Sequence, residues 1–272
     1  MIGFVLTCHQ SKKIRPNGFY IVDRFLQSLH SHCHYEHKIY LFDNSSEDEF
    51  DIEKYKDFNI EYTYINDQTI RGNTGPWNDG VIKAFMDGAE QVYICNDDLI
   101  LNKSINNLIS EVKSHKYNNV GIYAPLCQPN GVLGGPQGAN SPTFKISDVT
   151  GKGEVGSLPT SGYLLNGFLF GFTREFYNRY KYDSNKIFNP SSEYIWNANE
   201  CEFQLRLWKL GARSFIIGSC WIYHEKIRAW KVHTNPSGNQ SKMTTKERLK
   251  FSEDKLLDYD DNWKHKFEKF NK

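Results

Sequence analysis

Short apolar runs alternate with helical patterns through the first half of the chain, and this alternation restricts the fold more than any other feature. Bulky apolar runs predict strands at 2–8, 37–42, 60–65, 91–96 and 120–126. Apolar residues at helical spacing predict helices at 18–29, 77–88 and 104–115. Strands that alternate with helices indicate an α/β fold, with a mostly parallel central sheet covered by helices on both faces.

One predicted strand ends on two adjacent carboxylates. Residues 92–95 form the run Val-Tyr-Ile-Cys, which is typical of a strand buried on both faces, and Asn96, Asp97 and Asp98 follow directly. The carboxyl ends of strands in open α/β sheets face the ligand crevice. Because neighbouring carboxylates repel each other and oxygen ligands suit Mg²⁺ or Mn²⁺, we expect a divalent cation there, with positions left open for a diphosphate. The alternatives are a polar loop or the N-cap of the next helix.

The second half of the chain is less regular. Residues 128–162 contain eight glycines and four prolines, which predicts a long loop. The pattern then predicts an apolar run at 163–172, helices at 174–180 and 200–210, a stop at Gly211, and a strand at 214–223 that His224 follows. We therefore expect one domain at 1–225, with halves at 1–126 and 127–225, and then a basic loop and a charged C-terminal helix at 226–272.

Charge and cysteine usage exclude several classes of protein. The chain has 272 residues and a net charge of +1, whereas a protein that binds duplex DNA usually has a stronger basic bias, so we expect no nucleic-acid partner. The six cysteines are scattered and form no Cys-x-x-Cys pair, which favours free thiols in a reducing compartment. We find neither a signal peptide nor an apolar run of membrane-spanning length, so we expect a cytoplasmic protein.

Several short motifs follow one another in a recognisable order. They are Thr7-Cys8-His9, Asp43-Asn44-Ser45-Ser46, the run 71–80 with its two Asn-x-Gly triplets, Asn96-Asp97-Asp98, and the later pair formed by 166–176 and 199–206. In this order and spacing they resemble the GT-A fold glycosyltransferases, specifically those like glycosyltransferase family 2. The resemblance covers about residues 1–225.

The resemblance implies a Rossmann-like GT-A sheet for residues 1–225, and the charged helix predicted by the pattern after residue 225 is a C-terminal extension of it. It implies an inverting, metal-dependent enzyme that moves a sugar from a UDP-, GDP- or dTDP-sugar to a hydroxyl of a glycan or glycolipid. It assigns the catalytic base to Glu200, and a Mn²⁺ or Mg²⁺ ion to Asp98 and His224. The residues that it assigns to the nucleotide sugar are Thr7, His9, Asp43, Arg71, Asn73, Asn78 and Asp97.

Two positions depart from the family pattern. Asn96 stands where the family has the first Asp of its metal motif, and Asn199-Glu200 replaces Glu-Asp, so the expected base has a side chain one methylene longer. The chemistry still suits these residue types. A cation neutralises the charge on a leaving diphosphate, and a carboxylate at a helix start, where the helix dipole favours its ionised form, accepts a proton from the attacking hydroxyl.

Each assignment has a structural alternative. Asp43 suits an ordinary turn, Glu200 and Glu202 suit the solvated face of a helix, with Glu202 as the reserve candidate for the base, and His224 suits a hydrogen-bonded strand end. Trp77 suits the core better than a sugar-stacking site. The His and Cys residues between 30 and 37 suggest zinc, but no second cluster completes a tetrahedral set.

Two other functions compete with glycosyl transfer. A sugar-1-phosphate nucleotidyltransferase has a related sheet, but it needs a glycine-rich phosphate loop after the first strand, and residues 7–13 contain no glycine. A non-catalytic module that binds carbohydrate or nucleotide is the other alternative. The presence of both Asp98 and Glu200 argues against such a module.

Overall fold

The computed structural model describes residues 1–9, 21–46, 50–66, 72–127, 152–154, 165–181, 185–190 and 199–224. The predicted nucleotide contact at Arg71 lies outside these residues. So do the basic loop and the C-terminal helix expected at 226–272, and most of the loop expected at 128–162.

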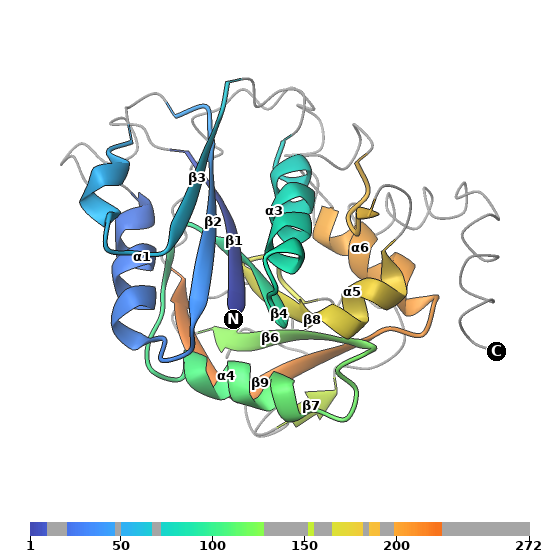
Figure 1. The fold of residues 1–272 in the computed structure, drawn as a ribbon. Coiled ribbons are helices and arrows are strands. Elements are labelled where there is room, and N and C mark those ends of the chain that lie inside the picture. Colours follow the sequence, from blue (N-terminus) through green and yellow to red (C-terminus); the bar gives the residue numbers. More distant parts are fainter. Residues whose placement is uncertain are drawn as a thin grey trace.

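The described strands form one sheet with the order β3-β2-β1-β4-β8-β6-β9-β5, and β7 pairs with β9 (Figure 1). The strands are β1 (Ile2–Cys8), β2 (His37–Asn44), β3 (Ile60–Ile65), β4 (Gln91–Asn96), β5 (Leu99–Ile100), β6 (Gly121–Cys127), β7 (Lys152–Glu154), β8 (Leu169–Thr173) and β9 (Arg213–His224). The helices are α1 (Ile21–His32), α3 (Thr74–Met86), α4 (Ile105–Ser114), α5 (Arg174–Tyr180), α6 (Asn199–Trp208) and the 3₁₀ turn η1 (Ile52–Tyr55).

The direction of the strands changes at β8. Strands β3, β2, β1 and β4 pair in parallel, and so do β6 and β9. Strand β8 lies between these two groups and is antiparallel to both β4 and β6. The sheet is therefore mixed, with parallel pairing along its longest ladders, which confirms the predicted α/β class.

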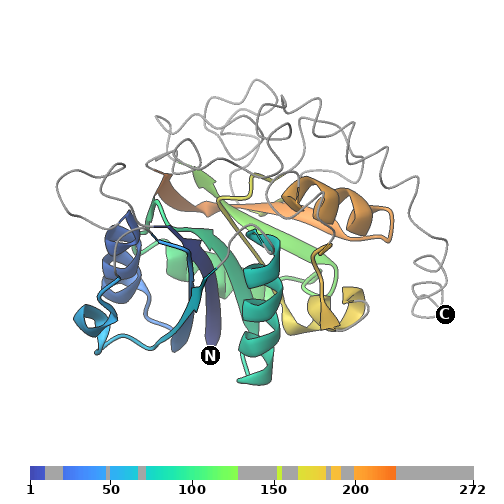
Figure 2. The same cartoon turned by 90° about the horizontal axis from the view of Figure 1, so that it is seen from above.

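Helices cover both faces of this sheet. Apolar residues of α1 and α4 belong to one buried cluster, and those of α3, α5 and α6 belong to the other. Figures 1 and 2 show α1 and α3 on opposite sides of β1 and β2. The two clusters are separated by the sheet because successive side chains of a strand point to opposite faces. The fold therefore has three layers, helix–sheet–helix.

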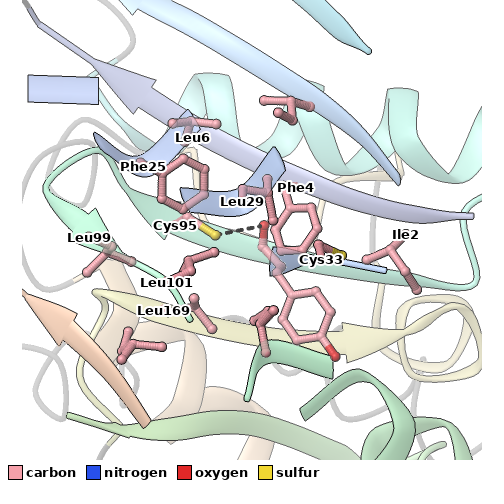
Figure 3. Close-up of a cluster of buried hydrophobic side chains, with 14 of the residues drawn as sticks. Ile2, Phe4, Leu6, Phe25, Leu29, Cys33, Cys95, Leu99, Leu101 and Leu169 are labelled. Carbon is pink, nitrogen blue, oxygen red and sulfur yellow. Dashed lines mark hydrogen bonds between the residues drawn. The ribbon is translucent and has the colours of Figure 1, made fainter. Parts of the chain in front are cut away.

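The alternation is clearest along β1. Phe4 and Leu6 pack against Phe25 and Leu29 of α1 in the first cluster, which Figure 3 shows in detail, whereas Val5 belongs to the opposite cluster. Each of these residues is fully buried. The strand is thus covered on both faces, which explains why its sequence is apolar throughout rather than alternating.

Four of the six cysteines have side chains that the structure describes. Cys8, Cys33, Cys95 and Cys220 are all buried and form no disulfide. The Sγ of Cys95 lies 3.7 Å from the carbonyl oxygen of Tyr93, and burial raises the pKa of this thiol (Figure 3). Buried thiols of this kind act as small apolar core residues.

Helix α3 approaches β1 unusually closely, because glycines lie on both sides of the contact. A Cβ atom on Gly3 would lie 2.8 Å from the Cβ of Ala84, and a Cβ on Gly80 would overlap the side chain of Val5. Gly80 belongs to the run 71–80, for which the resemblance implies contacts with the nucleotide sugar. Its close contact with Val5 explains why a glycine stands inside the helix at this position. The close contact fixes the N-terminus of α3 beside the carboxyl end of β1.

Element boundaries differ from the prediction at several points. Strand β2 continues to Asn44, and α3 begins at Thr74, three residues before the predicted start. The elements η1, β5 and β7 were not predicted, because they have only two to four residues each and are too short to show a period. None of the described helices has the length and apolarity that crossing a bilayer requires.

Charged side chains link the amino ends of β2 and β3 to the last turn of α3. The ammonium of Lys38 lies 2.6 Å from Asp87 and 2.9 Å from Glu61, and Lys83 also pairs with Glu61. Hydrogen bonds from Lys83 and Lys38 hold the pKa of Glu61 below its ordinary value of 4.5, and a hydrogen bond from Lys38 lowers that of Asp87 below 3.8. The two carboxylates therefore stabilise the folded state only when they are ionised.

We expect Glu61→Gln to lower the free energy of unfolding by about 0.2–1 kcal/mol at pH 7, a range that already allows for solvent screening. Because the folded-state pKa is depressed, this contribution is complete above pH 4.5 and is lost as the pH falls through the lower folded-state value. Urea unfolding at several pH values measures it. Asp57→Asn, which removes an exposed carboxylate outside this network, is the control. A difference between Glu61→Gln and the wild type that does not shrink as the pH falls below 4.5 would contradict the prediction.

Candidate functional site

The predicted site residues lie at the carboxyl ends of the parallel strands. In the sheet register Thr7 is opposite Asn96 of β4, and Cys8 is opposite Asp43 of β2. These positions share one edge of the sheet because parallel strands end on the same side. Ligand crevices of open α/β sheets form at this edge, so the register agrees with the location that the sequence predicts.

Polar side chains meet where β1, β2 and the N-terminus of α3 converge. The Oδ1 of Asn73 accepts hydrogen bonds from Thr7 Oγ1 at 3.3 Å and from Asn44 Nδ2 at 3.4 Å. The ring of His9 donates from Nδ1 to the carbonyl oxygen of Asn44 at 3.0 Å. We call Thr7, His9, Asn44 and Asn73 the amide cluster. Three of its members were predicted, and the structure brings them together.

Asn44, the fourth member of this cluster, was not predicted as a site residue. Its side chain is 3% exposed, and within the described residues its Oδ1 has no hydrogen-bond partner. A buried amide oxygen without a partner costs free energy unless a ligand or water satisfies it. The only sequence signal was its place beside Asp43 in a polar turn, which turn chemistry alone explains.

Asp43 is buried, and both of its oxygens accept hydrogen bonds. The backbone N–H of Ser46 donates to Oδ1 at 2.9 Å, and the hydroxyl of Tyr62 donates to Oδ2 at 2.8 Å. Burial and the contact with Asp43 raise the pKa of Tyr62, so this phenol stays protonated as a donor. The turn interpretation of Asp43 is thus correct. Each oxygen has a second lone pair for a ligand, and contact with a nucleotide base stays a prediction.

Asn78 has a structural role that the sequence did not indicate. Its Oδ1 accepts hydrogen bonds from the backbone N–H groups of Ile187 and Phe188, both at 3.0 Å, and its Nδ2 donates to the carbonyl oxygen of Phe188. The side chain is buried and holds the segment 185–190 against α3. Contact between Asn78 and a nucleotide stays a prediction, and it would have to coexist with these bonds.

Asp98 and His224 lie side by side, although 126 residues separate them. Asp98 is in the turn between β4 and β5, and β5 pairs antiparallel with the end of β9, so that Leu99 is opposite His224. The Nε2 of His224 lies 2.9 Å from Asp98 Oδ1, and both side chains are buried. The alternative in which Asp97 or Asp98 caps the next helix is wrong, because α4 begins at Ile105 with Ser104 at its N-cap.

A bulge in β9 makes this contact possible. Pro125 of β6 is opposite Ile217, whereas the next residue, Leu126, is opposite Trp221, so residues 218–220 have no partner in β6. Extra residues in one strand of a pair bend it and increase its twist. After the bulge, Trp221 and Ile222 pair with β6 again, and the last two residues of β9, Tyr223 and His224, pair with β5.

The donor atoms of this pair suit a small divalent cation. At bond lengths of about 2.0–2.1 Å, neighbouring ligands of an octahedral Mg²⁺ lie about 2.9 Å apart, which matches the separation of His224 Nε2 and Asp98 Oδ1. The same spacing suits a hydrogen bond between the two side chains, which is the structural alternative. No group of three or more His, Cys, Asp or Glu side chains within the described ranges could hold a metal. A cation at this pair would therefore need ligands beyond it, and half-buried Asp97 is adjacent.

Glu200 lies in the first turn of α6, and its environment is restricted. Its backbone N–H donates to Asn199 Oδ1 at 2.9 Å. A Cβ atom on Gly167 would lie 3.2–3.4 Å from the Cβ, Cγ and Cδ of Glu200, so a glycine at this position leaves room for the side chain. Glu200 is only partly buried.

One short segment connects Glu200 to the Asp98–His224 pair. Phe168 follows Gly167, and its ring lies 5.5 Å from that of His224. The carbonyl oxygen of Phe168 also accepts a hydrogen bond from the backbone N–H of Asn96 at 2.8 Å. Gly167 is the neighbour of Glu200, and Phe168 is the neighbour of His224. Because consecutive Cα atoms are about 3.8 Å apart, these two residues place the expected base and the expected metal ligand on either side of one short segment.

Glu202, the reserve candidate for the base, is a structural residue. It is fully buried, and its Oε1 accepts a hydrogen bond from Arg206 Nε at 2.6 Å. Arg206 also donates to the carbonyl oxygen of Ile187 at 2.7 Å, so this ion pair holds the same segment as Asn78. A carboxylate enclosed in this way cannot reach an acceptor in solution.

The zinc alternative also receives no support. The ring of the exposed residue His30 stacks on Phe58, with centroids 4.1 Å apart, and His37 Nδ1 donates to the carbonyl oxygen of Tyr35. Trp77 is buried in the core and meets Phe170 and Phe188 edge-on, as predicted.

Comparison with known proteins agrees with this architecture. S. aureus TarS 1-349 in complex with UDP matches over 82% of this chain with a TM-score of 0.57 and 18% identity. GalNAc-T7 with UDP, GalNAc and Mn²⁺ matches over 82% with a TM-score of 0.57 and 14% identity. Both are GT-A glycosyltransferases. This chain has the GT-A fold. The fold class that the motifs implied is therefore confirmed.

These similarities extend over part of each known structure. The chain covers 59% of TarS 1-349 and 43% of GalNAc-T7, so it spans less than two thirds of either. The complex of TarS 1-349 with UDP-GlcNAc gives the same picture, with 17% identity, a TM-score of 0.57 and 83% of this chain covered. No protein-family model matches the sequence, and no curated protein matches it.

We expect Arg206→Met to lower the free energy of unfolding by about 3–5 kcal/mol, because it leaves the Glu202 carboxylate buried without its counter-charge. Urea unfolding measures the change. The double variant Glu202→Leu with Arg206→Met is the control, since removing both charges should restore much of the lost stability. A single variant as stable as the wild type would show that Arg206 is not needed to hold Glu202.

Proposed function

We propose that this protein is an inverting, metal-dependent glycosyltransferase that moves a sugar from a nucleoside diphosphate sugar to a hydroxyl of a glycan or glycolipid. The observation that supports this best is the segment Gly167–Phe168. A Cβ on Gly167 would lie 3.2–3.4 Å from the Glu200 side chain, so the two residues are neighbours, and Phe168 lies beside His224. Transfer of a sugar needs a proton acceptor near the incoming hydroxyl and stabilisation of charge near the departing diphosphate. The two sides of this segment carry residue types suited to these two tasks.

The donor side is built from the amide cluster and Asp43. Its amide and hydroxyl groups offer hydrogen bonds to a ribose or a phosphate, and Asn44 Oδ1 is a buried acceptor without a partner in the described part of the chain. UDP-sugars are the first donors to test, because TarS was crystallised with UDP and UDP-GlcNAc, and GalNAc-T7 with UDP.

Asp98 and His224 would hold a Mn²⁺ or Mg²⁺ ion. GalNAc-T7, which has the same fold, was crystallised with Mn²⁺. Such a cation, when bound, supplies Lewis-acid stabilisation of the negative charge on the diphosphate. The chain itself orients the imidazole, because Phe168 packs against its ring and the pairing of β5 with β9 fixes its backbone.

Glu200 is the proposed general base. As the acceptor oxygen forms its bond to the anomeric carbon, the bond from that carbon to the diphosphate oxygen breaks, and the hydroxyl proton passes to the Glu200 carboxylate. A single displacement of this kind inverts the anomeric configuration. The transition state has oxocarbenium character, as in glycoside hydrolysis. The start of α6 favours the ionised carboxylate through the helix dipole.

An assay with a panel of donors tests the activity. We expect the purified protein with Mn²⁺ to release UDP from one UDP-sugar, slowly without an acceptor and faster with glycan acceptors. Release of pyrophosphate from a nucleoside triphosphate and a sugar phosphate would instead identify a nucleotidyltransferase. Binding of the donor with neither transfer nor hydrolysis would identify a non-catalytic module. Either of these two results contradicts the proposal.

Glu200→Gln keeps the shape of the side chain and removes its basicity. We expect it to lower the kcat of transfer by about 10²–10⁴-fold, the usual contribution of a general base, with little change in the affinity for UDP. Steady-state kinetics and calorimetric titration measure the two quantities. The matched control is Glu175→Gln, which changes an exposed carboxylate in the first turn of α5. Full activity of Glu200→Gln would exclude Glu200 as the base.

Metal binding is tested without the reaction. We expect Mn²⁺ titrated in the presence of UDP and followed by electron paramagnetic resonance to bind the wild type, and to bind Asp98→Asn or His224→Gln at least about tenfold more weakly, since each variant removes one of two protein ligands. His34→Gln, which alters an exposed imidazole, should bind as the wild type does. Equal affinity in all four proteins would exclude this site for the cation.

A further inference from the structure

A continuous series of polar contacts runs from the amide cluster to Glu200. Thr7 and Asn44 donate to the side chain of Asn73, which is the N-cap residue of α3. The next residue, Thr74, accepts a hydrogen bond from Asn199 of α6. Two consecutive residues at the start of α3 therefore contact the donor side and the acceptor side of the site.

The contact between Thr74 and Asn199 is buried. The two side chains are 0% and 4% exposed, and Asn199 Nδ2 lies 3.3 Å from Thr74 Oγ1. Water cannot easily replace a buried partner, so loss of either group costs more than the hydrogen bond itself contributes. Asn199 uses the other end of its amide on Glu200, whose backbone N–H donates to Asn199 Oδ1. Its amide plane thus fixes the start of α6 relative to α3.

Further contacts hold the first turn of α6. A Cβ atom on Gly167 would lie 3.2–3.4 Å from the Cβ, Cγ and Cδ of Glu200, so the glycine leaves room for this side chain. The Glu200 carbonyl oxygen also accepts a hydrogen bond from Gln204 Nε2, which in turn donates to the carbonyl oxygen of Leu165. The place of the carboxylate therefore follows from where the first turn of α6 is held.

We propose that Thr74 and Asn199 are positioning residues that set the place of the Glu200 carboxylate relative to the donor side of the site. The inference rests on the proposed function, because it assigns these residues a part in glycosyl transfer. Thr74 and Asn199 touch neither donor nor acceptor in this scheme. They act through Glu200, and the N-terminus of α3 contacts the residues of both the donor side and the acceptor side of the site.

The kinetic test compares three variants. Thr74→Val keeps the branched shape and loses the hydroxyl, Thr74→Ser keeps the hydroxyl, and Asn199→Ala removes the other partner. We expect Thr74→Val and Asn199→Ala to lower the kcat of transfer by about 10–100-fold, as misplacement of a catalytic group does, with the Kd of UDP unchanged. Thr74→Ser should stay within about threefold of the wild type, since it keeps the acceptor oxygen.

The double variant Thr74→Val with Asn199→Ala shows whether the two residues act through one contact. We expect its kcat to be no lower than that of the less active single variant, because the same contact between Thr74 and Asn199 is lost in each. Losses that multiply would overturn the inference, and so would equal losses in Thr74→Val and Thr74→Ser.

An NMR measurement tests the inference without the reaction. The protein is labelled with ¹³C at glutamate carboxyl carbons, and Glu200→Gln assigns the Glu200 signal. We expect the resonance of this carboxyl carbon to shift in Thr74→Val and Asn199→Ala and to stay in place in Thr74→Ser. An unchanged Glu200 signal in both Thr74→Val and Asn199→Ala would overturn the inference, whatever the stability of the two variants. If the wild type shows no transferase activity, the proposed function fails, and the NMR result still decides whether these residues position Glu200.

Discussion

The antiparallel direction of β8 is the constraint on which the site depends. Because β8 runs opposite to β4, its first residues lie at the carboxyl end of β4, where Leu169 is opposite Cys95. The residues just before it, Gly167 and Phe168, therefore reach the edge where Asp98 and His224 meet. A parallel strand at this place in the sheet would put the same segment at the far edge. The reversal of one strand thus brings residues 167 and 168 from the second half of the chain beside Asp98 from the first half.

Much of the sheet could be predicted because its strands are buried on both faces and read as continuous apolar runs. The ends of β1, β2, β4 and β9 also indicated where polar groups gather, and the GT-A fold that the motifs implied is confirmed. Strand β5 could not be predicted, since Leu99 and Ile100 become a strand only through pairing with β9. Without that pair, the meeting of Asp98 with His224 has no explanation in the sequence.

Contacts between distant polar residues were the other part that the sequence concealed. Glu202 looked like a solvated helix residue, and only the fold shows that Arg206 neutralises it inside the protein. The amide of Asn78 was assigned to a ligand because of its motif, and it holds the backbone of residues 187 and 188. Asn and Glu side chains serve equally well in recognition and in support, so their type does not distinguish the two roles. The burial of the side chain and its hydrogen-bond partners distinguish the two roles, and both depend on tertiary packing.

The bulge at residues 218–220 has a consequence for how this protein can change. The first half of β9 contributes Phe215, Ile216 and Ile217 to the two apolar clusters, where a slip of one residue would exchange the faces. The second half ends at His224. The three residues between them interrupt the ladder with β6, so the pairing register before residue 218 need not pass to the residues after 220. Because Cys220 and Ile222 also lie in an apolar cluster, packing of its own holds the part of β9 that ends at His224, and substitutions near Phe215 can accumulate with less effect on the place of the imidazole.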